Sequence, residues 1–445
     1  MDISAGDTAW VLISAALVLL MTPGLAFFYG GMVRAKSVLN MIMMSIVTMG
    51  VVGVLWVLVG FSLVFGDSIG GVIGNPFDFP GLVALLDEGA VVDTIPTLAF
   101  VGFQAAFAVI AVALVSGAVA DRMRFSAWIV FAALWALLVY FPAAHWVFAF
   151  DGSVSEHGGF IANTIGALDF AGGTAIHINA GAAALALCLV LGPRLGFRAS
   201  PMRPHNLPFV MLGAALLWFG WFGFNAGSAL GANQTAAFAY VNTIAAPAAG
   251  MLAWLVVERL RDGRPTSLGA ASGIVAGLVG ITPAADSVTP LGALVIGILS
   301  GVGASLAIGL KNRLGYDDSL DVVGVHLVAG LIGTLSIGLL ADPAAPAGEA
   351  GLLFGGGLGL LGAEALSAGA VLGYSFVMTS IIALVLKGVM GGRLRVSSHD
   401  ESRGIDVAEH AETSYDFSLL PYSKQHVKSS IVVPATAETK EEVSQ

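Results

Sequence analysis

The chain is long, apolar and poor in charge. It has 445 residues, of which 57% are hydrophobic and 11% are charged, and its mean hydropathy is +0.89. Soluble domains are about 45–50% apolar and about 25% charged, so this composition excludes an ordinary soluble protein and predicts a polytopic membrane protein. The net charge of −10 suggests no nucleic-acid partner, and a single cysteine, Cys188, excludes an internal disulfide.

Runs of about 20 apolar residues, which can cross a hydrocarbon core of roughly 30 Å, predict an all-α fold. We expect residues 1–395 to form the transmembrane domain and 396–445 a cytoplasmic tail that is disordered after about residue 415. The eleven predicted transmembrane helices are 10–32, 39–65, 96–119, 125–146, 166–191, 207–231, 236–258, 266–284, 289–310, 321–340 and 366–390.

Basic residues predict the orientation of these helices. Arg34 and Lys36 follow the first span, and the pattern continues to Lys387 at the end of the last, so that all 19 Lys and Arg residues follow odd-numbered spans. Positive residues concentrate in cytoplasmic loops, which places the N-terminus outside and the C-terminus in the cytoplasm of a cell-membrane protein. The first span is followed, not preceded, by basic residues, so we interpret it as a retained helix.

Two histidines lie inside apolar spans. His177 is eight residues after Asp169 in the fifth span, and His326 is five residues after Asp321 in the tenth. A single histidine of this kind is commonly a core residue whose hydrogen bonds are made inside the protein, but a matched pair favours a functional site. Inverted repeats of five helices would bring both to the middle of the bilayer. We expect both imidazoles to be neutral, since burying a charge is costly, and to share a hydrogen bond.

Aromatic residues form a second group of candidates. Phe103 and Phe107 share one face of the third span, as an ordinary packing stripe would also do. Trp221, Phe224 and Ser228 share one face of the sixth span, where a cation would meet rings and a hydroxyl. The fourth span ends in an aromatic cluster at 141–150, which is typical of an interfacial belt and also of a binding site.

Four segments, 21–40, 169–185, 220–228 and 321–326, resemble the ammonium transporter family, the Amt branch of the Amt/Mep/Rh superfamily. The resemblance extends in order over residues 8–415. It implies transport of ammonium or methylammonium across the cell membrane by a homotrimer with one pore in each subunit. It also implies a possible regulator of the PII class at the cytoplasmic face, and no enzymatic activity.

The resemblance implies roles for individual residues. Phe107 matches the outer gate phenylalanine of the family, with Phe224 as its partner. Phe148 stands where the family has a tryptophan at the external cation site, and phenylalanine offers a weaker ring face and no indole donor. The resemblance implies that His177 and His326 line the pore. Besides Phe148, the residues of the outer site are Trp221, Ser228 and Asp169. We expect Asp169 to position the site; a helix N-cap is its alternative role.

The mechanism implied is recruitment of ammonium outside, loss of a proton, and passage of ammonia past the two histidines, because an apolar channel penalises an ion. The alternatives are an ammonium sensor on the same fold and an Rh-type channel for small neutral solutes. The short polar tail argues against a sensor, and Trp221 and Ser228 argue against an Rh-type channel. Glu156 and His157 lack a third ligand, so we expect neither a metal nor another cofactor.

Overall fold

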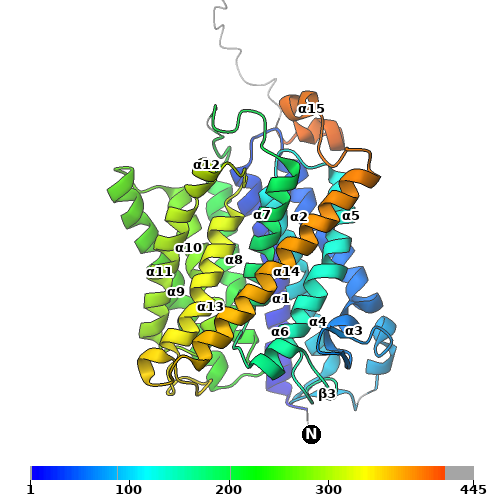
Figure 1. Cartoon of the computed structure of the whole chain (residues 1–445), viewed down its shortest axis with the longest axis vertical. Helices are drawn as coiled ribbons and strands as arrows, with labels where there is room; N and C mark the ends of the chain where they lie inside the picture. The colour runs from blue at the N-terminus through cyan, green and yellow to red at the C-terminus, as the bar shows by residue number, and fades with distance from the viewer. Residues whose placement is uncertain (1–2, 88, 201, 416–445) are drawn as a thin grey trace, which may run out of the picture. The chain divides into compact units, whose positions relative to one another are not determined.

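The structure, a computed structural model, describes residues 3–87, 89–200 and 202–415, and one compact unit extends to Ser414. Within these ranges, eleven helical segments are long and apolar enough to cross a membrane, which confirms the predicted all-α class (Figure 1). Several of these segments combine two or three consecutive helical elements. The segments are α1 (Ala5–Met32), α2–η1–α3 (Val38–Leu55, Trp56–Gly60, Phe61–Phe65), α4–η3 (Thr97–Val115, Ser116–Val119), α5–η4–α6 (Phe125–Trp135, Ala136–Tyr140, Phe141–Phe148), η6–α7 (Gly173–Ile178, Asn179–Leu191), α8 (Leu207–Gly227), α9 (Gln234–Arg261), α10–η7 (Ser267–Ile281, Thr282–Ala284), α11 and α12 (Pro290–Ala307, Leu310–Leu314), η8–α13 (Val323–Val328, Ala329–Leu340) and α14 (Gly359–Val389).

Short elements occupy the connections. Two small antiparallel ladders pair β1 with β2 and β3 with β4 in the loop between the second and third spans. The short elements are β1 (Ser68–Ile69), β2 (Ile73–Gly74), η2 (Pro80–Leu85), β3 (Val91–Val92), β4 (Ile95–Pro96), η5 (Ile161–Ile165), η9 (Leu352–Phe354), α15 (Ser398–Arg403) and η10 (Asp406–His410). In Figure 1, α12 and α15 lie at the end of the helices opposite β3 and the N-terminus.

The fifth span begins seven residues later than predicted, and the eleventh begins seven residues earlier. The fifth begins at Gly173 and not at residue 166, because residues 166–172 form an irregular segment before the helix. Gly166 (φ 69°) and Gly172 (φ 111°) adopt left-handed backbone conformations there, which glycine tolerates without strain from a Cβ atom. This segment carries Asp169 to the start of the helix.

The fifth and tenth spans pack closely where two glycines face the opposite helix. Gly181 and Gly330 each lie four positions after a histidine, His177 and His326 respectively. A Cβ on Gly181 would lie 2.5 Å from Leu327 Cβ, and one on Gly330 would lie 3.3 Å from His177 Cβ. Small residues allow such close approach of membrane helices. The matching positions are those expected of two helices related by an inverted repeat.

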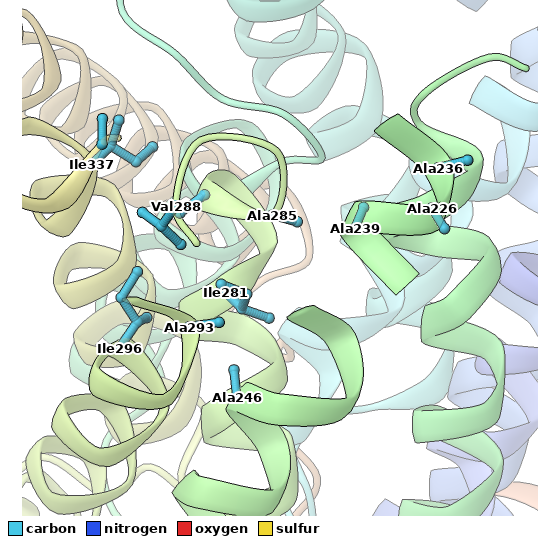
Figure 2. Close-up of a cluster of buried hydrophobic side chains, with 12 residues drawn as sticks. Ala226, Ala236, Ala239, Ala246, Ile281, Ala285, Val288, Ala293, Ile296 and Ile337 are labelled. Atoms are coloured by element: carbon cyan, nitrogen blue, oxygen red, sulfur yellow. The ribbon is translucent and has the colours of Figure 1, made fainter. Parts of the chain in front are cut away.

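An apolar cluster packs α8, α9, α10, α11 and α13 together and holds the turn between α10 and α11 (Figure 2). Its members are mostly alanine and β-branched residues that are 0–5% exposed. Alanine lets the helices approach closely where there is little hydrophobic driving force between them. The cluster consists of Ala226, Ala236, Ala239, Ala246, Ile281, Ala284, Ala285, Val288, Ala293, Ile296, Ile337 and Ala341.

The segment after α14 is hydrogen-bonded to the loops at the α12 end of the molecule. Asp406 accepts hydrogen bonds from the backbone N–H groups of Leu39 and Asn40 at the start of α2. Glu409 accepts one from Phe125 N at the start of α5. The domain boundary expected at residue 395 stays a prediction, and the disorder expected after about 415 concerns residues outside those described.

Candidate functional site

The two predicted histidines contact each other inside the protein. His177 lies in η6 and His326 in η8, and the two residues are only 1% and 3% exposed. Their Nδ1 atoms are 3.2 Å apart, and the rings are nearly parallel with centroids separated by 5.3 Å. Both η6 and η8 are π-helical turns, which are often found at functional sites. The helix crossing at Gly181 and Gly330 brings the rings together.

The contact between the Nδ1 atoms determines what the pair can offer to a solute. In a neutral pair one proton is shared between the Nδ1 atoms, so one ring has a bare Nε2 acceptor and the other an Nε2–H donor. Nε2 of His177 is buried and has no hydrogen-bond partner among the residues described. The pair can therefore accept a hydrogen bond from a small polar solute and donate one to it.

A cavity of about 10 Å³, enough for one water-sized molecule, adjoins the histidines. Apart from the imidazoles its lining is apolar or aromatic, so it offers no charged partner to an ion. It is lined by Met21, Leu25, Phe28, Ile110, Leu114, Ile176, His177, Leu217, Trp221, Phe224, Val275 and His326.

Phe107 and Phe224 separate this cavity from a larger one. Their rings are stacked with centroids 4.3 Å apart, and the residues are 1% and 0% exposed. Phe224 lines the histidine cavity, whereas Phe107 lines the larger cavity. Rings stacked at this distance are in van der Waals contact and leave no gap between them.

The larger cavity, which we call the outer cavity because it lies at the end of the helices predicted to face outside, has a volume of about 270 Å³. It contains Phe148, Ser228 and Asp169 from the predicted site. The Ser228 hydroxyl donates to the carbonyl oxygen of Phe224, so its oxygen lone pairs are left to accept from a ligand. The lining comprises Phe100, Phe103, Gln104, Phe107, Phe148, Phe150, Ser153, Ala162, Gly166, Ala167, Leu168, Asp169, Phe170, Ser228, Leu230 and Asp286.

Trp221 does not line the outer cavity, the site for which it was predicted. It lines the histidine cavity and stacks on His177 at 5.5 Å, and its indole N–H donates to Thr282 Oγ1. Trp221, Phe224 and Ser228 do share one face of α8, but each residue adds about 1.5 Å along a helix. Ser228 therefore faces the outer cavity, while Trp221 lies about 10 Å deeper.

Asp169 caps the helix that carries His177. Its two carboxylate oxygens accept four backbone hydrogen bonds at 2.7–3.1 Å, from residues 172–175. A carboxylate at this end also compensates the partial positive charge of the helix N-terminus.

The counterpart of Asp169 in the tenth span is Asp318, not Asp321 as expected from the sequence. Asp318 is eight residues before His326, and its Oδ2 accepts from Val323 N, just as Asp169 Oδ2 accepts from Thr174 N five positions ahead. Asp321 instead pairs with Lys311 at 2.5 Å. The equal spacing of eight residues was the signal in the sequence that would have identified Asp318.

A third cavity, of about 570 Å³, opens among the basic loops at the α12 end. Its rim contains Arg34, Arg194 and Lys311, each paired with an aspartate. Burial alone would raise the pKa of Asp317, but the hydrogen bonds and charge of Arg194 hold it below its usual value. These ion pairs link the loops that follow the first, third, fifth and ninth spans.

Known proteins resemble this chain over nearly its whole length. The model of the Ammonium Transporter Family matches residues 9–415. An ammonium transporter of Mycobacterium tuberculosis is 61% identical over 435 residues, covering 93% of this chain and 91% of the relative, and one of Corynebacterium glutamicum is 47% identical, covering 92% and 89%. The crystal structure of Saccharomyces cerevisiae Mep2 superposes with a TM-score of 0.85 at 33% identity, covering 95% of this chain and 94% of that one. A structure described as a sensor Amt protein has a TM-score of 0.84 at 31% identity, with coverage of 91% and 98%.

The apolar spans, the buried histidine pair and these similarities agree. The chain belongs to the ammonium transporter family, whose members are membrane transport proteins and not enzymes.

Proposed function

We propose that the chain takes up ammonium or methylammonium from outside the cell and passes the neutral amine through its interior. The observation that carries this proposal is the pair of imidazoles in an apolar, water-sized cavity behind two stacked phenylalanines. Moving an unpaired ion into such surroundings is far more costly than moving a neutral polar molecule. The pathway therefore favours ammonia over ammonium.

The outer cavity supplies what a small cation needs before it loses a proton. The faces of Phe107 and Phe148 attract a cation, and the Ser228 oxygen accepts a hydrogen bond from it. Asp169 positions this site by fixing the start of the helix beside it. After one phenylalanine ring moves, His177 and His326 hydrogen-bond the neutral solute on its way through.

The orientation and assembly belong to the same proposal. The N-terminus is outside, the basic loops face the cytoplasm, and three copies assemble with one pore each in the cell membrane. The basic third cavity and the docked C-terminal segment offer a surface for a PII-class regulator. Cross-linking of the purified protein in mild detergent tests the trimer, and a monomer under those conditions would contradict it.

Uptake of labelled methylammonium into proteoliposomes tests the transport mechanism. We expect the wild type to fill vesicles faster than empty liposomes do, and His177→Ala to alter the rate strongly because His326 loses its partner and the cavity widens. Gly373→Ala, at a position of α14 with open space around it, is a matched control. Wild-type uptake no faster than in empty vesicles would refute the proposal.

The sensor Amt neighbour makes an ammonium sensor the second candidate function. A sensor would bind ammonium in the outer cavity without sustained flux. The two candidates are separated by the same vesicle experiment combined with a binding measurement, since binding without uptake would favour the sensor.

A further inference from the structure

Asp286 is an acidic residue of the outer cavity that belongs to none of the four segments resembling the family. It lies in the turn between α10 and α11, and it lines the cavity together with Phe148, Ser228 and Asp169. Its neighbours Ala285 and Val288 are fixed in the apolar cluster (Figure 2). The turn is therefore held by the core, whereas the Asp286 side chain is outside the cluster.

The two carboxylates of the cavity differ in how far their oxygens are already used. Asp169 accepts four backbone hydrogen bonds as a helix cap. Asp286 Oδ1 accepts a bond from the Ser287 hydroxyl at 2.6 Å. Because Asp286 has far fewer bonds inside the protein, it is the carboxylate better able to interact with a cation in the cavity.

Building on the transport function proposed above, we propose that Asp286 attracts the ammonium cation into the outer cavity and sets the affinity of this site. A carboxylate close to an aromatic-lined cavity stabilises a cation more than a ring face does. It would offset the weaker ring of Phe148, which occupies the position where a tryptophan is expected. Asp286 acts on recruitment, before the gate, and has no role in the histidine pair.

The charge state of Asp286 should make the affinity of the outer cavity for a cation depend on pH. Burial raises the pKa of Asp286 to about 6, the Ser287 hydroxyl lowers it, and the nearby Asp169 raises it. Other polar groups around it are the Ser228 hydroxyl, Glu364 behind the Asp169 loop, and Asp342, whose loop bonds to this turn. No Lys, Arg or His is among the residues lining the cavity in the described part of the chain.

Asp286 is ionised above about pH 6 and attracts a cation, and it becomes neutral as the pH falls through that value. Methylammonium stays protonated over the same range, so a loss of apparent affinity there reports on the protein and not on the substrate.

The test measures KM and maximal rate for methylammonium uptake in proteoliposomes of the wild type, Asp286→Asn, Asp286→Glu and Asp342→Asn. Asp342 is the matched control, because it removes one charge from the adjacent loop but does not line the cavity. We expect Asp286→Asn to raise KM roughly three- to tenfold near neutral pH, as for loss of one partly screened charge. The maximal rate should change by less than about twofold, since the gate and pore are untouched.

Asp286→Glu should retain most of the wild-type affinity, and Asp342→Asn should equal the wild type. The wild-type KM should increase as the pH falls from about 7.5 to about 5.5, and that of Asp286→Asn should not, because only the former loses a charge there. An active Asp286→Asn variant with unchanged KM, or equal effects of Asp286→Asn and Asp342→Asn, would overturn the inference alone. If Asp286→Asn does not fold, a wild-type KM that is constant over this pH range overturns it. Wild-type uptake equal to that of empty vesicles would instead refute the transport function itself.

Discussion

One aromatic ring in the outer cavity distinguishes this site from the pattern that the family resemblance implies. Phe148 ends α6 and lines the cavity together with Phe107 and Ser228. Tryptophan binds cations more strongly than phenylalanine does, and a whole cation–π contact is worth about 0.5–1 kcal/mol at an exposed site, so the gain from this exchange is at most of that order. It also adds an indole N–H group. The identity of this one ring should therefore be visible in substrate affinity.

We expect Phe148→Trp to lower the KM for methylammonium by up to roughly fivefold, the ratio that corresponds to about 1 kcal/mol. The maximal rate should stay the same, because the ring lies before the gate. Kinetics of uptake into proteoliposomes measure both values. Phe150→Trp in the same cavity is the control, and an unchanged KM in Phe148→Trp would exclude this residue from the cation site.

At the scale of single residues, the sequence predicted which side chains line the cavities better than how deep they lie. His177 and His326 could be predicted because an ionisable residue in an apolar span is unusual. The depth of Trp221 was missed because a shared helix face says nothing of the distance along the axis. Asp318 was missed because Asp321 is closer to His326, although the spacing of eight residues from Asp318 to His326 equals that from Asp169 to His177.

At the scale of the element, the crossing of the fifth and tenth spans determines the distance between the histidines. A side chain on Gly181 would collide with Leu327, whose backbone nitrogen would be 2.6 Å from the new Cβ atom. Backbone cannot move aside as a flexible side chain can. The two helices would have to separate, and the Nδ1 contact between His177 and His326 would lengthen with them.

Gly181→Ala should therefore destabilise the protein by about 1–3 kcal/mol, the usual cost of overpacking. Its thermal midpoint in detergent should decrease, and methylammonium uptake should decrease with it. Gly373→Ala adds the same methyl group where no atom lies within 4 Å, so it should keep the wild-type midpoint and uptake. Equal midpoints and equal uptake in the two variants would show that the crossing tolerates a side chain.

The number of spans and their approximate bounds could be predicted from the lengths of the apolar runs. The changes from α-helical to π-helical turns inside the spans could not. The π-helical turns η1, η4, η6 and η8 leave no mark in hydropathy, because they depend on how neighbouring helices fill the space around them. The late start of the fifth span likewise depends on Gly166, Gly172 and the cap at Asp169, which act through local backbone geometry.

At the scale of the whole molecule, the proposed orientation in the membrane is inferred from the distribution of Lys and Arg among the loops, and it can be tested directly. Asp87 lies in a loop that the proposed topology puts outside, and Arg313 lies in α12, at the end of the ninth span that it puts inside; both residues are exposed. In a Cys188→Ala background, a membrane-impermeant maleimide should label Asp87→Cys but not Arg313→Cys in intact cells, because the charged reagent cannot cross the bilayer. Inside-out vesicles should give the reverse, and labelling of Arg313→Cys in intact cells would invert the topology.

The C-terminal segment binds distant loops through carboxylates, an arrangement that no local pattern in the sequence predicts. Glu401 is fully buried and accepts hydrogen bonds from Arg395 Nη2 and from the backbone nitrogen of Leu195, both at 2.6 Å. Asp406 and Glu409 cap the starts of α2 and α5. These bonds link the segment to loops that follow three different spans, so its attachment contributes to the stability of the whole helical unit.

Glu401→Gln should weaken this attachment, because the amide keeps one acceptor but turns an N–H group toward a donor. A buried donor left unsatisfied costs about 1–3 kcal/mol, and the partial exposure of Arg395 keeps the loss within that range. We expect a lower thermal midpoint and faster hydrogen exchange at Leu195 and in the segment 396–410. Glu412→Gln, at an exposed residue of the same segment, should change neither. If Glu401→Gln exchanged as slowly as the wild type, the carboxylate would not be what holds the segment on the loops, and the backbone bonds from Arg124 and Val396 would have to suffice.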